Sequence, residues 1–219
     1  GIRDLVRSRG LGDVYKRQSG TCAVMGTAST MACITETLGM ALPGTAAIPA
    51  IHADRLRAAE ASGAQAVHLA QIDRDKQLTP KKIITPASVE NALRILLAVG
   101  GSTNAIIHLT AIAGRLGIPI PLQQLNKLSD ETPVLIDLKP TGDHYMEDLF
   151  KAGGLGVVLR ELKPLLNLEC LSVTGETLNE RLQSEPAYVN REVVRSFDQP
   201  IQKMGGLVSL LSLIHISEP

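Results

Sequence analysis

Helix start and stop signals recur along this chain, and they constrain its fold more than any other feature. Thr85 can cap a helix that has Pro86 at its first position, and Gly100-Gly101 marks the end of that helix. Between such signals the apolar residues follow helical spacing. The sequence predicts helices over 30–42, 54–77, 86–99, 104–116, 145–152, 157–166 and 177–182, with short strands over 133–138 and 171–173. The expected fold class is α/β, helix-rich with short strands.

Two nine-residue segments near the ends of the chain are antisense copies of each other in DNA. Residues 211–219 read LSLIHISEP, and codons can be chosen for them whose reverse complement encodes GLGDVYKRQ, which is residues 10–18. Folding gives no reason for such a relationship, whereas an inverted repeat in a sequencing-library adaptor does. We therefore expect 1–18 and 211–219 to be translated adaptor, which is left out of reasoning about the fold.

Composition predicts an aliphatic core and a reducing compartment. Apolar residues make up 44% of the chain, but there is no Trp and there are only two Phe and three Tyr. The three cysteines are widely spaced and form no CxxC pair, which argues against a disulfide framework and fits the cytoplasm. The 22 basic and 22 acidic side chains balance, so nucleic acid and acidic membranes are not expected partners. The sequence also has no apolar run long enough to predict a membrane span.

Cys22 stands in a Gly- and Thr-rich loop, SGTCAVMGTASTM, directly before a predicted helix. We expect Ser29 to cap this helix and Pro43-Gly44 to close it. A helix N-terminus stabilises a thiolate through its free N–H groups and its dipole. Cys22 lies seven residues ahead of the expected cap, so a functional thiolate and a small buried apolar side chain both remain open from the residues alone.

Five sequence blocks, in this order and spacing, resemble the dihydroxy-acid and sugar-acid (phosphogluconate, pentonate) dehydratase family. The first is the Cys22 loop with the helix after it, and it is similar to the third cluster-cysteine motif of the family. The resemblance covers nearly all of 19–208 and implies a partial N-terminal dehydratase domain at 19–204. It also implies that 205–210 begins the connection to a missing C-terminal domain. The other four blocks are GGSTNA at 100–105, LKPTG at 138–142, KAGG at 151–154 and VTGET at 173–177.

The resemblance implies an iron–sulfur hydro-lyase, and Cys22 is the one ligand that it assigns to this chain. Members of the family hold a [2Fe–2S] or [4Fe–4S] cluster on three cysteines. The other two cysteines, the Mg²⁺ ligands and a serine base would lie outside this fragment, which would then be inactive by itself. The implied reaction removes water from a 2,3-dihydroxy carboxylic acid and yields a 2-keto acid.

The implied substrates are small acids, and two branches of the family stay open. The run SGTCAVMGTASTM favours the sugar-acid branch, such as a pentonate, over the 2,3-dihydroxy-3-methyl acids of branched-chain amino-acid biosynthesis; 6-phosphogluconate is the least favoured. The full-length protein is expected to form a homodimer or homotetramer. A non-catalytic α/β binding or scaffold domain that retains the fold is the alternative. A nucleotide-binding oxidoreductase ranks low, since GxGxxG and GxxxxGK[ST] are absent.

Other polar residues have more ordinary interpretations. Cys33 and Cys170 are expected to be packed in the core. Gly100-Gly101-Ser102-Thr103 is expected to form a tight turn between helices with a Ser or Thr cap, in preference to an anion site. His108 is expected to be buried on an apolar helix face, and Glu36 to face solvent or a local partner. The other histidines show no metal-ligand spacing.

Overall fold

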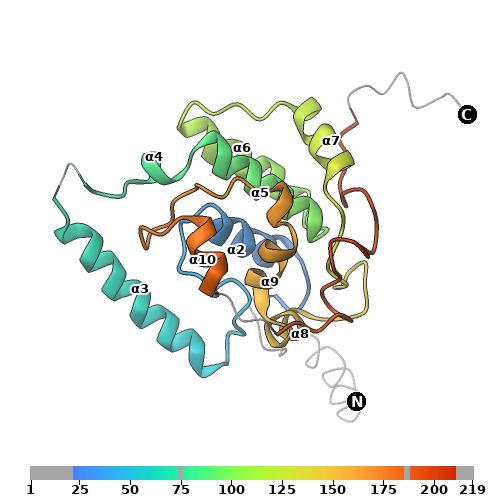
Figure 1. The fold of residues 1–219 in the computed structure, drawn as a ribbon, viewed down its shortest axis with the longest axis horizontal. Helices are drawn as coiled ribbons and strands as arrows, with labels where there is room; N and C mark the ends of the chain where they lie inside the picture. The colour runs from blue at the N-terminus through green and yellow to red at the C-terminus, as the bar shows by residue number, and fades with distance from the viewer. Residues whose placement is uncertain (1–21, 74–75, 185–187, 211–219) are drawn as a thin grey trace, which may run out of the picture.

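The computed structural model describes residues 22–73, 76–184 and 188–210, and helices dominate them (Figure 1). The helix-rich fold class predicted from the sequence is confirmed. The adaptor-like segments at 1–18 and 211–219 lie outside the described residues. The elements in chain order are α2 (Thr27–Thr37), α3 (Ala53–Gln71), α4 (Pro80–Ile83), α5 (Pro86–Ala98), α6 (Asn104–Arg115), α7 (Leu122–Glu131), α8 (Met146–Lys151), α9 (Gly154–Glu161), the 3-10 helix η1 (Lys163–Leu165) and α10 (Leu178–Ser184).

Helix α5 is the central element, and its start follows the predicted cap. The Thr85 hydroxyl accepts a hydrogen bond from the Ser88 N–H at 3.2 Å, and the Ser88 hydroxyl accepts one from the Thr85 N–H at 2.9 Å. This reciprocal capping box satisfies two N–H groups that a helix N-terminus leaves free. Every residue from Asn91 to Ala98 is buried. In Figure 1, α6 lies beside α5, and α2 lies near the middle of the molecule.

Two clusters of aliphatic side chains form the core, and α5 contributes to both. Ile95 and Val99 pack with the side chains of α8 and α9. Leu93 and Leu96 pack with α2, α6 and α7. The aliphatic core expected from the composition is therefore present, and it is divided between the two sides of one helix.

The predicted start and end of the first helix were wrong. Gly26, and not Ser29, is the N-cap of α2, and Ser29 lies buried inside the first turn. The Ser29 hydroxyl donates backward to the Val24 carbonyl at 3.0 Å and does not cap the helix. The helix also ends at Thr37, five residues early, because Gly39 adopts a positive φ of 81° where the chain passes the backbone at Leu171.

The predicted strands are extended segments that make isolated bridges. Segment 133–138 lies beside two later parts of the chain and beside His144, and segment 171–173 folds back on Thr177. Helix α3 ends at Gln71, before the predicted end at 77. Helix α7 was missed, because Pro121 and a polar composition hid its buried stripe of Leu125, Leu128 and Ser129.

Candidate functional site

Cys22 lies against the N-terminus of α2. It is four positions before the N-cap Gly26, which is closer than the seven residues predicted from a Ser29 cap. A Cβ atom built on Gly26 would lie 3.3 Å from the Cys22 Sγ, so the absence of a side chain at Gly26 leaves room for the sulfur. The cysteine is a free thiol and is half-buried. The first N–H groups of a helix have no partner within the helix, so this place offers backbone donors beside the sulfur.

The loop that carries Cys22 is held by the LKPTG motif at 138–142 and by the residues that follow this motif. The Met25 N–H donates to the Lys139 carbonyl at 2.8 Å, and the Met146 N–H donates to the Ala23 carbonyl at 2.9 Å. The Lys139-Pro140 peptide between these contacts is cis. Met25 itself is buried in the core. The backbone directly after the cysteine is therefore fixed by residues more than a hundred positions away in the sequence.

The turn between α5 and α6 docks on the first turn of α2. The Ser102 N–H donates to the Thr30 hydroxyl at 3.1 Å, and the Ser102 and Thr27 hydroxyls lie 2.8 Å apart. The Asn104 amide also donates to the Thr27 hydroxyl at 3.2 Å. Gly101 is needed for this approach, because a Cβ there would lie 2.6 Å from the Thr30 Cγ2. The predicted tight turn is confirmed, but the N-cap Thr103 makes no side-chain cap bond.

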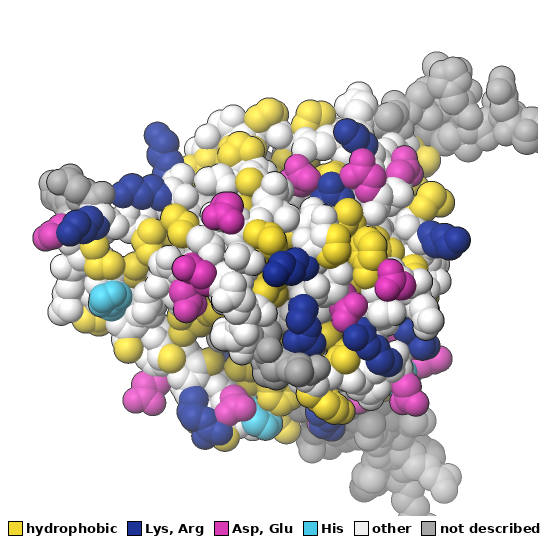
Figure 2. All heavy atoms as spheres, viewed as in Figure 1, with side chains coloured by type: hydrophobic (Ala, Val, Ile, Leu, Met, Phe, Trp, Pro, Cys, Tyr) yellow, Lys and Arg dark blue, Asp and Glu magenta, His cyan; other side chains and the backbone are white. Residues whose placement is uncertain are grey.

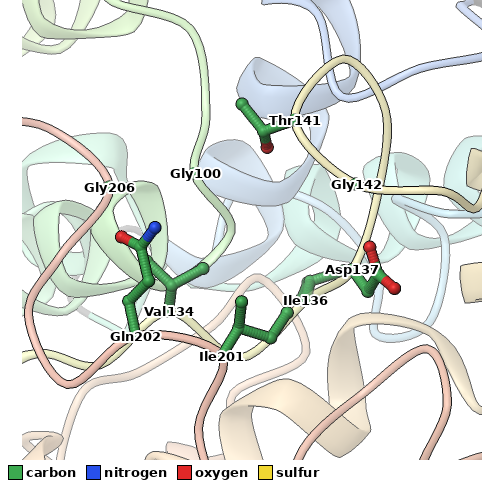
Figure 3. Close-up of a pocket in the computed structure, with 9 residues that line it drawn as sticks. All are labelled: Gly100, Val134, Ile136, Asp137, Thr141, Gly142, Ile201, Gln202 and Gly206. Atoms are coloured by element: carbon green, nitrogen blue, oxygen red, sulfur yellow. The ribbon is translucent and has the colours of Figure 1, made fainter.

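A cavity of about 140 Å³ lies beside these same motif turns (Figure 3). Gly100 comes from the turn after α5, and Thr141 and Gly142 come from the LKPTG motif. The Asp137 carboxylate at its edge accepts a hydrogen bond from the Asp143 N–H at 2.9 Å and is therefore engaged within the protein. The complete lining is Gly100, Val134, Ile136, Asp137, Thr141, Gly142, Ile201, Gln202 and Gly206.

Glu36 is one of the residues that the sequence interpretation placed wrongly. It is 1% exposed, and its carboxylate forms an ion pair with the buried Arg181 of α10. The same carboxylate accepts hydrogen bonds from the Gly44 N–H at 2.9 Å and the Ala46 N–H at 2.7 Å. Glu36 thus connects α2, the loop at 42–46 and α10. The only sequence signal was its place within the first family-like block.

The comparison with known families decides which family this chain represents. A sequence profile described as "Dihydroxy-acid/6-phosphogluconate dehydratase N-terminal" matches residues 10–181. The chain belongs to the dihydroxy-acid/6-phosphogluconate dehydratase family. The matched profile describes the N-terminal region of that family, as the sequence predicted.

Several similar proteins carry the name dihydroxy-acid dehydratase. The one from Caldanaerobacter subterraneus subsp. tengcongensis is 42% identical over 197 residues, 89% of this chain and 34% of the relative. The one from Caldicellulosiruptor bescii is 44% identical over 191 residues, 86% of the chain and 34% of the relative. The one from Methanospirillum hungatei is 42% identical over 191 residues, which are 87% of the chain and 34% of the relative. The chain therefore spans about a third of the length of these relatives.

The other two cysteines of this dehydratase-family chain have different surroundings from Cys22. Cys33 is fully buried on α2, as predicted, and burial raises its pKa to about 12, with the negative charge of Glu36 as a second cause. Cys170 is only half-buried, and it accepts a hydrogen bond from the Asn91 amide at 3.5 Å. Burial also raises the pKa of Cys170. Both thiols therefore favour the protonated form, which is a poor metal ligand.

The histidines do not assemble into a site with the acidic residues that the structure describes. His108 is exposed on α6, so the expectation that it is buried was wrong. His52 caps α3 by accepting the Asp54 N–H at 3.2 Å. The His144 Nδ1 atom lies 3.4 Å from the Asp137 Oδ2 atom. Within 22–73, 76–184 and 188–210, no three His, Cys, Asp or Glu side chains are grouped as metal ligands. Cys22 is therefore not part of a complete metal site among the described residues.

Proposed function

We propose that this chain is part of a hydro-lyase in which Cys22 is one of the thiolate ligands of an iron–sulfur cluster. The observation that carries the proposal is the half-buried Cys22 sulfur beside the N-terminus of α2, in the space that Gly26 leaves. Membership of the dehydratase family supports it. The cluster would be [2Fe–2S] or [4Fe–4S], and the remaining cysteines would come from sequence outside this chain.

The residues of this chain would hold and orient the cysteine. The backbone bonds from Met25 and Ala23 to segment 139–146 fix the loop, and the turn at Ser102 fixes the first turn of α2. A fixed thiolate places its metal without reorganisation at each turnover. When bound, the cluster would supply a Lewis-acidic iron for a departing hydroxyl group, as metal ions do in other enzymes.

The proposed substrate is a 2,3-dihydroxy carboxylic acid. Loss of the C3 hydroxyl and the C2 proton forms water and an enol, and the enol becomes a 2-keto acid. A bound Mg²⁺ and a serine base outside this chain would assist removal of the proton. The names of the similar proteins support a dihydroxy acid as substrate, whereas the Cys22 motif favours a sugar acid such as a pentonate. Both substrates therefore belong in the test.

Further properties of the whole protein are part of this proposal. Residues 205–210 would begin the connection to a C-terminal domain, and they already pack on α5 and α7 through bonds such as Gly206 N–H to the Leu97 carbonyl. The full-length protein would be a cytoplasmic homodimer or homotetramer. Among the described residues, no helix combines the length and the hydropathy that crossing a bilayer requires.

The test requires the full-length gene product, expressed and purified without oxygen. We would record the iron–sulfur absorbance and the formation of 2-keto acid from pentonates and from 2,3-dihydroxyisovalerate. The Cys22→Ser variant is expected to lose the absorbance and the activity together. Cys170→Ser is the matched control, since it removes a half-buried thiol elsewhere and should keep both.

The outcomes separate the two functions that the sequence left open. A coloured protein that forms a 2-keto acid supports the hydro-lyase, and the preferred acid identifies the branch. A colourless protein that is inactive on both acids, with Cys22→Ser indistinguishable from the unmodified protein, would contradict the cluster assignment. The family fold would then serve a non-catalytic binding or scaffold domain.

A further inference from the structure

The Ser29 hydroxyl is a buried polar group that points out of its own helix. Ser29 is the third residue of α2 and is 4% exposed. Serine hydroxyls inside helices commonly face solvent or bond to the carbonyl four residues earlier. The Ser29 hydroxyl instead donates to the Val24 carbonyl, ahead of the helix, at 3.0 Å, and it lies 3.5 Å from the Cys22 carbonyl oxygen. One buried hydroxyl therefore faces two carbonyls of the loop that carries the cysteine.

The Val24 carbonyl is the point at which the loop turns into α2. The Gly26 N–H also donates to this carbonyl, at 2.8 Å, and closes a three-residue turn. A carbonyl oxygen has two acceptor positions, and here the turn fills one and Ser29 fills the other. The Cys22 sulfur lies against the backbone of Gly26, where a Cβ would come within 3.3 Å of it. Ser29 thus ties to the helix the turn that borders the sulfur.

Ser29 also reaches the backbone of the cysteine itself. The bonds to segment 139–146 are made by Ala23 and Met25, which follow the cysteine. Among the described residues, the Ser29 hydroxyl is the only group that bonds to the Cys22 carbonyl. Because O–H···O bonds are strongest below about 3.0 Å, this carbonyl is the second, weaker acceptor of the hydroxyl. Without Ser29, the Cys22 carbonyl would have no bond to the described part of the chain.

The loop and most of α2 are free of charged side chains. Charged groups of both signs are spread over the visible face of the molecule in Figure 2, but segment 22–35 contains no Asp, Glu, Lys, Arg or His. Within this segment, only Ser29 and Thr30 bond through their side chains to the loop at 22–26. The Thr30 hydroxyl donates to the Gly26 carbonyl, which the Thr30 N–H already binds. The distinct side-chain contribution to the shape of the loop therefore comes from Ser29.

We propose that Ser29 is a positioning residue that holds Cys22 in place for metal binding; the inference rests on the proposed function of Cys22 as a cluster ligand. Ser29 acts through the carbonyls of Cys22 and Val24. A metal ligand has to keep its donor atom within a few tenths of an ångström of one position, and the groups that orient it supply this precision. Because Ser29 is buried, water does not compete for its hydroxyl.

Thr35 provides the matched control for a hydroxyl that only stabilises the helix. It lies on the same helix, and its hydroxyl donates to the Met31 carbonyl at 2.7 Å, a bond that stays within α2. Thr35→Val and Ser29→Ala each remove one hydroxyl that bonds to a backbone carbonyl. In Ser29→Ala the Val24 carbonyl keeps the Gly26 N–H as a donor, so the variant is expected to fold. Urea unfolding should show a similar, small loss of stability in both variants.

Two measurements on the full-length protein, purified without oxygen, test this proposal. The first is hydrogen exchange, read by mass spectrometry over the peptide that covers 22–26. Exchange is expected to be about fivefold faster in Ser29→Ala, the effect of losing one hydrogen bond, and unchanged in Thr35→Val. The second is the release of iron to a chelator, followed by the decay of the iron–sulfur absorbance. Release should be about tenfold faster in Ser29→Ala and unchanged in Thr35→Val.

The Cys22→Ser variant separates a failure of this inference from a failure of the proposed function. If Cys22→Ser loses the cluster while Ser29→Ala releases iron at the same rate as Thr35→Val, the role of Ser29 is wrong and the function stands. If Cys22→Ser keeps the cluster, the proposed function fails, and the role of Ser29 in metal binding fails with it. Faster exchange and faster release in Ser29→Ala alone would support the proposal. Neither measurement depends on dehydratase activity.

Discussion

Cys33 is a buried thiol beside a buried carboxylate, and this arrangement predicts a specific alkaline sensitivity. Burial raises the pKa of Cys33 to about 12 from the value of 9.0 for a free thiol, and the Glu36 charge adds to the shift. Below pH 9 the thiol is protonated in both the folded and the unfolded chain. Between pH 9 and pH 12 only the unfolded chain ionises, so the stability that the protonated thiol confers is lost as the pH rises.

The expected effect is a loss of about 1 kcal/mol of unfolding free energy per pH unit above pH 9. It would be measured by urea unfolding of the unmodified chain and of Cys33→Ala, from about pH 8 to about pH 11. The variant lacks this titrating group and should lose less stability over the range, although it starts from a lower value because a buried sulfur is removed. Parallel curves for the two proteins would contradict the assignment.

The sequence predicted the surroundings of a residue when its contacts are local, and failed when its contacts are distant in the sequence. Cys33 was placed correctly in the core, and Cys22 in a loop before a helix, since an apolar helix face and such a loop are local patterns. The role of Cys22 as a ligand stays a prediction. Glu36 was placed wrongly, because its partner Arg181 is 145 positions away and the loop it binds, at Gly44 and Ala46, bends back only in the folded chain. His108 was placed on the buried side of α6, whereas the buried residues of that helix are Ala105, Leu109 and Ala113.

At the scale of elements, the local signals gave the helices well and their ends less well. The Thr85-Pro86 start was correct because its cap is made by residues within one turn. The start of α2 was misplaced because Ser29 donates to Val24, a bond that depends on how the Cys22 loop folds. Segment 133–138 was recognised as extended, but its neighbours at Val194 and Gln202 come from a distant part of the chain.

The contact between the α5–α6 turn and α2 gives a prediction about two glycines. Gly101→Ala is expected to cost about 1–3 kcal/mol, because its Cβ would lie 2.6 Å from the Thr30 Cγ2 and 2.9 Å from the Leu96 Cδ1. Gly114→Ala is the matched control: it has open space in α6 and should be neutral or stabilise by up to about 1 kcal/mol. Urea unfolding of the two variants measures both effects. Equal changes in the free energy of unfolding for the two variants would show that the turn does not pack closely against α2.

At the scale of the whole molecule, α5 connects the two core clusters, because it contributes side chains to both. Ile95 belongs to the cluster that includes Leu155 and Leu159 of α9. Leu96, the next residue, belongs to the cluster that includes Leu109 of α6. Both side chains are fully buried. Because one rigid helix carries them on two sides, the loss of packing in either cluster should be transmitted to the other.

Ile95→Ala tests whether the two clusters unfold as one cooperative unit. It should cost about 2–5 kcal/mol, since it leaves a cavity among fully buried side chains. Native-state hydrogen exchange then measures how much protection the amides of each helix lose. Amides of α6, which the substitution does not touch directly, should lose as much protection as amides of α9. Ile107→Ala, at a position that is 68% exposed, is the control and should change neither. If α9 loses protection while α6 keeps it, the clusters unfold independently, and α5 would then be a boundary between two units.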